Sequence, residues 1–379
     1  MNGLKEKLLK VKWKHFINYI AIGIVALIFS LLTLTAGLPQ STLYLLETIT
    51  MNIVLAVSLS LVVGFLGELS LGHAGFMCIG AYIGGKIASV IGGNSLLCFI
   101  PALIAGALVA GIFGFVIGLP ALRLKGDYLA IVTLAFGEIV KTIFENTSDE
   151  SFGGAIGLDT PRFNKNYLFI IGFVLVLITI FIIQNLIRSK HGRAITAIRD
   201  NEIAAKATGI NVTKYKLVGF IISALFAGAA GVFYSFTVNT VKASVFDYNY
   251  SIEILIMVVI GGMGSISGSI ISATAITFIN NLLQTSLKGD LSVIKDIVYA
   301  LILVLIIIYN NAPGLKHFRE KYNFKKLTAK LTFVKNPAYD GGDEGAWHRV
   351  PTKIEMNEVL STDVIISEST KKPDKEDKS

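Results

Sequence analysis

The segment that decides the fold is YLFIIGFVLVLITIFIIQNLI, residues 167–187, which carries no charged side chain along its whole length. A helix needs about 20 predominantly apolar residues to cross a bilayer, so this segment predicts a membrane-spanning helix. A second apolar segment, LVGFIISALFAGAAGVFYSF at 217–236, follows after a polar interval. Such segments recur along the chain, whereas a membrane β-barrel would show alternating segments of about 10 residues. The sequence therefore predicts an all-α, polytopic membrane helical bundle.

The composition of the chain supports this class. Of its 379 residues, 53% are hydrophobic and only 16% are charged, whereas soluble domains carry roughly 25% charged residues. The two cysteines, Cys78 and Cys98, lie within apolar segments and predict no disulfide. The net charge of +8 does not indicate binding to nucleic acid, because excess Lys and Arg in a membrane protein belong mostly to cytoplasmic loops.

We expect about ten transmembrane helices in the lipid bilayer. The first follows a basic N-terminus without an evident small-residue cleavage site, which favours an uncleaved helix over a signal peptide. The eighth is short and runs into the glycine-rich GGMGSISG at 261–268, which favours a broken or re-entrant helix. The predicted spans are 16–37, 43–66, 74–91, 96–119, 127–146, 167–187, 216–237, 251–264, 268–285 and 293–311.

The distribution of Lys and Arg predicts the orientation of these helices. With the N-terminus in the cytoplasm, most basic residues fall in predicted cytoplasmic segments, above all 1–15, 188–215 and the segment from 312 onward, and few fall on the other side. A permease domain at 16–315 is thus expected between a basic cytoplasmic N-terminus and a polar cytoplasmic tail at 316–379. From about residue 337 the tail has too few apolar residues to fold alone, which predicts disorder.

The polar interval between the two opening segments has the pattern of a folded element. It is HGRAITAIRDNEIAAKATGINVTKYK, residues 191–216. Recurring alanines predict a helix from Ala194 to Gly209, where the glycine is a natural stop. Asp200 or Asn201 could cap a second short helix. A rigid amphipathic helix on the cytoplasmic face suits docking into a partner's groove, and the alternative is a solvated connector that keeps positive charge inside.

Four segments carry a resemblance to a known family. EIAAKATG at 202–209 resembles the coupling motif of ATP-binding-cassette importer permeases, Glu-x-Ala-Ala followed by Gly. Together with its surroundings and three further segments, it resembles the LivM-type permease family of branched-chain amino acid transporters. The resemblance covers about residues 17–315, and the polar tail departs from the family's pattern. The three further segments are GELSLGHAGFMCIGAYIGG (67–85), LRLKGDYLAIVTLAFGEIVK (122–141) and VVIGGMGSISGSIISA (258–273).

This resemblance implies a type II importer-like architecture, similar to that of the cobalamin importer permease, and a second, LivH-like permease subunit as partner. It also implies two cytoplasmic ATPase subunits, which bind ATP and Mg, and an extracytoplasmic substrate-binding protein. The implied coupling segment is 190–214. Its implied residues are Arg193, Arg199, Glu202, Ala204, Ala205 and Gly209, and the implied signature of the 67–85 segment includes Ser70, Gly72 and His73.

Ionisable residues and glycines within the spans are candidates for a translocation path or gate. Glu138 lies near the middle of its predicted helix, and the alternative for it is a structural pair within the bundle. Glu47 and Glu253 are expected near the outer interface. Broken helices often mark a gate or substrate site in transporters, the alternative here being a tight turn. The glycines of the predicted break are Gly261, Gly262, Gly264 and Gly268.

The lack of catalytic motifs in the sequence bears on the class of function. The sequence has no phosphate-binding loop and no convergent nucleophile–base or metal-ligand cluster, so we predict neither an enzyme nor a metal site. We predict the permease subunit of an ATP-driven importer of branched-chain amino acids in the bacterial cytoplasmic membrane. The alternatives are a permease of the same superfamily for urea, short amides or another small solute, and a secondary transporter or channel, which would not need a coupling helix.

Overall fold

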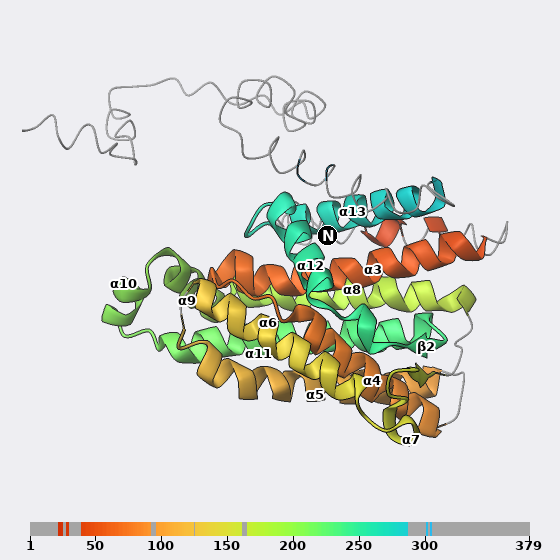
Figure 1. Cartoon of the computed structure of the whole chain (residues 1–379). Coiled ribbons are helices and arrows are strands. Elements are labelled where there is room, and N and C mark those ends of the chain that lie inside the picture. The colour runs from red at the N-terminus through yellow and green to blue at the C-terminus, as the bar shows by residue number, and fades with distance from the viewer. Residues whose placement is uncertain are drawn as a thin grey trace, which may run out of the picture. The chain divides into compact units, whose positions relative to one another are not determined.

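The computed structural model describes residues 22–25, 28–29, 39–91, 96–124, 126–160, 165–286, 301 and 304. The chain divides into two units, Met1–Ala312 and Pro313–Ser379, and all described residues belong to the first. Their elements form a bundle of α-helices with one short two-stranded ribbon (Figure 1). The predictions for residues 1–15, for most of the spans 16–37 and 293–311, and for the tail at 316–379 fall outside the described residues.

The helices follow the order of the apolar segments. The first long one, α3 (Gln40–Ser60), continues into a π-helix, η2 (Leu61–Leu66). Two short strands, β1 (Leu158–Asp159) and β2 (Thr240–Val241), pair antiparallel. The other elements are α4 (His73–Ile91), α5 (Leu96–Ala121), α6 (Asp127–Glu145), α7 (Asp149–Phe152), α8 (Lys165–Arg188), α9 (Lys190–Asp200), α10 (Glu202–Ala207), α11 (Val212–Thr237), the 3-10 helix η3 (Ala243–Val245), α12 (Tyr248–Gly261) and α13 (Ile266–Ser286).

Six of the described helices are long and apolar enough to cross a membrane, judged by length and composition. They are α3 together with η2, α4, α5, α8, α11 and α13. α12 is apolar but has only 14 residues, about 21 Å at 1.5 Å per residue, which is less than the roughly 30 Å of a bilayer core. α6 fills the predicted span 127–146 and is more polar, because it carries Glu138, Lys141 and Glu145. The all-α membrane class is confirmed, and the count of about ten spans stays a prediction.

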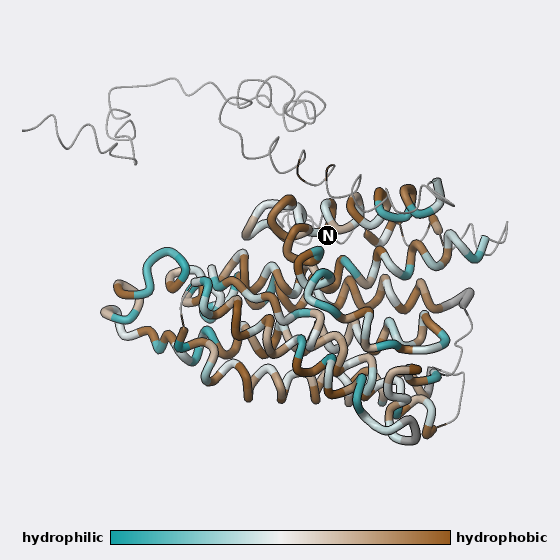
Figure 2. The backbone as a smooth tube through the Cα atoms, viewed as in Figure 1, coloured by the Kyte–Doolittle hydropathy of each residue, from teal (hydrophilic) through white to brown (hydrophobic). Residues whose placement is uncertain are grey.

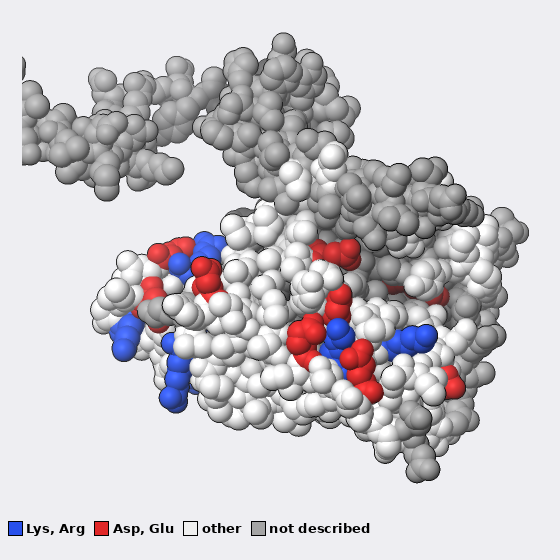
Figure 3. Space-filling view, in the orientation of Figure 1, with Lys and Arg blue, Asp and Glu red and all other residues white. Residues whose placement is uncertain are grey.

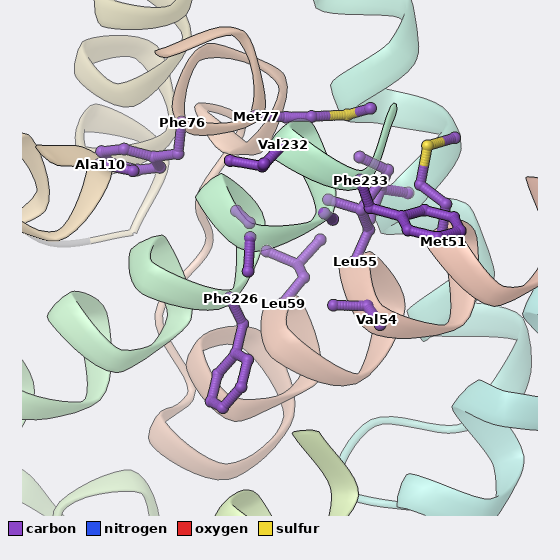
Figure 4. Close-up of a cluster of buried hydrophobic side chains, with 14 of the residues drawn as sticks. Met51, Val54, Leu55, Leu59, Phe76, Met77, Ala110, Phe226, Val232 and Phe233 are labelled. Atoms are coloured by element: carbon purple, nitrogen blue, oxygen red, sulfur yellow. The ribbon is translucent and has the colours of Figure 1, made fainter. Parts of the chain in front are cut away.

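The core of the bundle forms where α11 packs against α3, α4 and α5. Figure 4 shows Leu55 and Leu59 of α3 close to Phe233 of α11. Glycines allow the backbones to approach closely. A Cβ built on Gly80 of α4 would lie 2.0 Å from the carbonyl oxygen of Gly228 in α11, so no larger residue fits there.

The outer faces of the helices are apolar, and the polar residues gather at particular places. Ile104, Leu108 and Ile112 of α5 are each more than half exposed, as expected for side chains that face lipid. Figure 2 shows hydrophilic residues at the end of the bundle that carries α9 and α10. Charged side chains gather at the same end and in a second group over α6 (Figure 3). The α9–α10 end is therefore the polar end of the described bundle.

Candidate functional site

The segment between α8 and α11 folds into two short helices held by side-chain caps. The Ser189 hydroxyl accepts hydrogen bonds from the backbone N–H groups at the start of α9. Asn201 has extended backbone (φ −159°, ψ 105°), and its Oδ1 accepts from the backbone N–H of Ala204 at 3.0 Å. Gly209 follows α10 with φ of +85°. The single helix predicted over 194–209 is thus interrupted at Asn201, whereas the capped second helix and the glycine stop are confirmed.

The two helices have a buried face and an exposed face. Ile195 and Ile198 of α9 are buried against the bundle. In α10, Ala205 is only 4% exposed and is buried within the fold, whereas Ile203 is 80% exposed. Among the predicted coupling residues, Arg193, Arg199, Ala204 and Gly209 are also exposed, and Glu202 is partly buried. The exposed surface of α10 therefore carries one large apolar side chain, which the sequence prediction did not single out.

A buried lysine ties α10 to the bundle. Lys216, near the start of α11, is 3% exposed, and its Nζ contacts a carboxylate oxygen of Glu68, in the loop after η2. The same Nζ lies 3.4 Å from Oε2 of Glu202, the first residue of α10. Ion pairs that are removed from water depend strongly on both partners being present. The network therefore fixes α10 relative to the loop after η2.

Arg199 connects α9 to the π-helix η2. Its Nη1 donates to the carbonyl oxygen of Gly64 at 3.1 Å, and its Nε and Nη2 donate to Oδ1 of Asp200 at 3.1 and 2.9 Å. Gly67, with φ of +78°, leaves room for this side chain, because a Cβ there would lie 2.7 Å from Cγ of Arg199. Arg199 is thus held between its own helix and the end of α3–η2.

The glycine-rich break lies at the same place. α12 ends at Gly261, and the turn to α13 contains Gly262 and Gly264 with φ of +90° and +82°. A Cβ on Gly64 would lie 2.4 Å from the backbone nitrogen of Gly264, and one on Gly268 would lie 1.7 Å from the carbonyl oxygen of Gly261. The break is therefore a tight turn packed against η2. It meets α9 through Gly64 and Arg199.

Residues of the 67–85 signature lie where helices pack closely against one another. His73 begins α4, and its Nε2 lies 3.0 Å from the Ser58 hydroxyl of α3. A Cβ on Gly72 would lie 2.6 Å from the carbonyl oxygen of Thr133 in α6, and Ser70 is 1% exposed. Within the part of the chain that the structure describes, no group of three or more His, Cys, Asp or Glu side chains is arranged to hold a metal ion. These residues join α3, α4 and α6.

The side chain of Glu138, on α6, contacts the start of α12. Its Oε1 accepts from the backbone N–H of Tyr248 at 2.8 Å, and its Oε2 lies 3.5 Å from Nζ of Lys141. Asp247 caps the same helix by accepting from the backbone N–H of Tyr250. A carboxylate at a helix N-terminus complements the exposed N–H groups and the helix dipole. This position corresponds to the structural pair that the sequence left open for Glu138.

A cavity of about 260 Å³ opens between α3, α12 and α13, and its lining on α3 comes from the N-terminal part of that helix. Asn52 of α3 crosses it, because its Oδ1 accepts from the Tyr250 hydroxyl at 2.9 Å and its Nδ2 donates to the Thr277 hydroxyl at 2.8 Å. Glu253 of α12 also lines it. The described lining residues do not include Glu138 or the glycines of the break. The sequence had not indicated that these polar groups converge.

Known proteins resemble this chain over most of its length. A family model described as "Branched-chain amino acid transport system / permease component" matches residues 41–308. The high-affinity branched-chain amino acid transport system permease proteins LivM of Salmonella typhimurium and Escherichia coli K12 are each 32% identical over 317 residues, which cover 75% of this chain and 72% of theirs. The ribose import permease protein RbsC of Escherichia coli K12 is 26% identical over 311 residues, which cover 78% of this chain and 92% of its own. No solved structure gives a significant match.

Proposed function

Because the chain belongs to the family of branched-chain amino acid transport system permease components, we propose that it carries leucine, isoleucine and valine across the cytoplasmic membrane as the permease subunit of an ATP-driven importer. The observation that carries this proposal is the 32% identity to LivM proteins over three quarters of the chain. The capped helices α9 and α10 support the link to ATP, because they are anchored to the bundle and project from its polar end (Figures 1 and 2). ATP hydrolysis is assigned to partner subunits.

A second candidate substrate class comes from the ribose import permeases, whose resemblance is lower but covers nearly their full length. We therefore keep another small solute, such as a sugar, urea or a short amide, as the alternative. The two candidates share the permease role and differ only in what passes through the bundle.

Uptake by the complete transporter tests the substrate. Cells that produce this chain with its second permease, ATPases and binding protein are expected to accumulate labelled leucine, and deletion of this chain alone should abolish that uptake. Isoleucine and valine should compete with leucine, and ribose should not. Accumulation of labelled ribose without leucine uptake, in cells where all subunits are assembled, would contradict the proposal.

The partners of the subunit follow from this role. We propose two ATPase subunits beneath α9 and α10, a LivH-like second permease beside the bundle, and a substrate-binding protein on the far side. The proposed ATPase-contacting segment is 190–214, with Ile203 as its apolar contact. The glycine-rich turn is proposed as the gate, because Arg199 and Gly64 connect it directly to α9.

We propose a topology with about ten spans and both termini in the cytoplasm. The basic residues of the 188–215 segment support it, because such residues favour the cytoplasmic side. A cysteine in place of Lys206, which is exposed on α10, should react with an impermeant thiol reagent only after the cells are made permeable. Labelling of this Lys206→Cys variant in intact cells would invert the proposed orientation.

A further inference from the structure

The long helix α8 has a buried face and an exposed face. Phe169 and Ile183 are fully buried, and the helix packs chiefly against α3. On the opposite face, Val174, Ile178 and Phe181 are 49%, 46% and 58% exposed. Positions three or four residues apart lie on one face of a helix, so these three side chains form a continuous apolar stripe, called here the α8 stripe.

A cluster of basic side chains lies at the end of this stripe. Arg188, the last residue of α8, follows Phe181 by seven residues and therefore lies on the same face of the helix. Lys190 and Arg193 follow at the start of α9, and all three basic residues are exposed. The Ser189 cap fixes the turn between the two helices. This basic cluster, Arg188, Lys190 and Arg193, therefore keeps its place relative to the α8 stripe.

The basic cluster has an excess of positive charge. No acidic residue occurs in the sequence from 165 to 199. The ion pairs found among the described residues do not include the three side chains of the cluster. Asp200, the next acidic residue along the chain, is paired with Arg199. Basic residues that lie beside the end of a membrane-spanning helix attract anionic lipid headgroups, so the charge of the cluster is complementary to such a headgroup.

The dimensions of the two features match one leaflet of a bilayer. The apolar span of α8 ends at Arg188. Ile178 lies ten residues earlier, a distance of about 15 Å along the helix and half of the roughly 30 Å hydrocarbon core. An acyl chain that lies along the α8 stripe therefore brings its headgroup to the basic cluster. A free phosphate ion would use the cluster alone, whereas an anionic phospholipid uses both features.

We propose that the basic cluster and the α8 stripe together bind an anionic phospholipid, whose phosphate contacts Arg188 and Lys190 and whose acyl chain lies along the stripe. Hydrogen bonds from a guanidinium or ammonium group to a phosphate are charge-assisted and therefore strong. A zwitterionic lipid carries an ammonium group that offsets its phosphate charge, so the site favours phosphatidylglycerol over phosphatidylcholine. The site goes beyond the import of a solute, because it recognises a component of the membrane itself.

Lipid binding by the full-length subunit, purified in detergent and measured by native mass spectrometry, tests this inference. The probes are phosphatidylglycerol and phosphatidylcholine with identical acyl chains. The subunit is expected to bind phosphatidylglycerol about tenfold more tightly, and the Arg188→Gln/Lys190→Gln double variant should lose this preference, because both phosphate contacts are charge-assisted. Arg188→Lys, which keeps the charge, should retain most of it. An excess of glycerol 3-phosphate, which has the phosphate and no acyl chain, should not displace the lipid.

Matched variants separate this site from the general charge of the polar end. Lys206→Gln/Lys214→Gln removes two exposed basic residues outside the cluster and should keep the preference for phosphatidylglycerol. Phe181→Ala should weaken the binding of both lipids severalfold, because it shortens the α8 stripe. Phe115→Ala, which changes an exposed phenylalanine of α5, should weaken neither.

Three results would each overturn the inference. They are equal binding of the two lipids by the unaltered subunit, an equal loss of preference in the two double variants, and displacement of the lipid by glycerol 3-phosphate. Loss of ATPase co-purification by Arg188→Gln/Lys190→Gln, with the lipid preference unchanged, would also overturn it and would assign the basic cluster to a protein partner.

Discussion

Replacing Ile203 with Asp is expected to abolish leucine uptake while the subunit remains folded in the membrane. Ile203 is 80% exposed at the polar end of the bundle, so its substitution should change the free energy of unfolding by no more than about 0.5 kcal/mol. In an ATPase groove the same side chain would be buried, and an aspartate there would have to lose its hydration without a partner. The measurement is co-purification of the ATPase subunits in detergent, together with cellular uptake of labelled leucine.

Two matched variants on α10 make this test specific. Ile203→Leu keeps the apolar contact and should retain uptake. Lys206→Ala changes an exposed residue on the same helix and should also retain it. If Ile203→Asp still co-purified with the ATPases and supported full uptake, α10 would be a connector rather than a coupling element.

Replacing Lys216 with Met is expected to destabilise the subunit by about 3–5 kcal/mol, the range found when one partner of a buried ion pair is removed. The lysine is 3% exposed, and its loss leaves the Glu68 carboxylate buried without its cation. α10 would also lose its tie to α11 through Glu202. The measurement is thermal unfolding of the purified subunit in detergent, with membrane yield as a second readout.

The neighbouring lysine offers a matched control for this effect. Lys214 lies two residues before Lys216 on the same helix and is exposed, so Lys214→Met should leave the unfolding temperature nearly unchanged. Adding Glu68→Gln to Lys216→Met should recover part of the lost stability, because the unpaired charge is removed. If Lys216→Met and Lys214→Met unfolded at the same temperature, the buried ion-pair network would not contribute to the stability of the subunit.

The sequence predicts features of this fold that depend on neighbouring residues. Long apolar segments predict the helices because each must satisfy its own backbone hydrogen bonds in lipid. The Asn201 cap and the Gly209 stop were predictable for a similar reason, since both act on backbone groups a few residues away. The fact that Ala205 faces the bundle and Ile203 faces solvent was not predictable, because a helix as short as α10 has too few turns to show a periodic pattern.

The candidate sites were harder to predict because their partners are distant in sequence. Lys216 and Glu68 are 148 positions apart, and nothing near either residue indicates the other. The same holds for Asn52, which meets Tyr250 and Thr277 across 198 and 225 positions. The sequence places Glu138 near the middle of a predicted span, but its contact with Tyr248 depends on where α12 begins. Such juxtapositions require the packing of the helices to be known.

The π-helix η2 makes the length of the chain at this point as important as its composition. In a π-helix each backbone hydrogen bond joins residues five positions apart, rather than four as in an α-helix. The six residues Leu61–Leu66 therefore contain one residue more than regular α-helical pairing would need. Deleting one of them would remove this additional position and favour regular α-helical pairing, which changes the direction in which the residues within the segment face. Gly64 would then no longer face both Arg199 and Gly264. Side chains such as Val62 can be exchanged for others of similar size, whereas insertions and deletions between Leu61 and Leu66 should be excluded from functional members of this family.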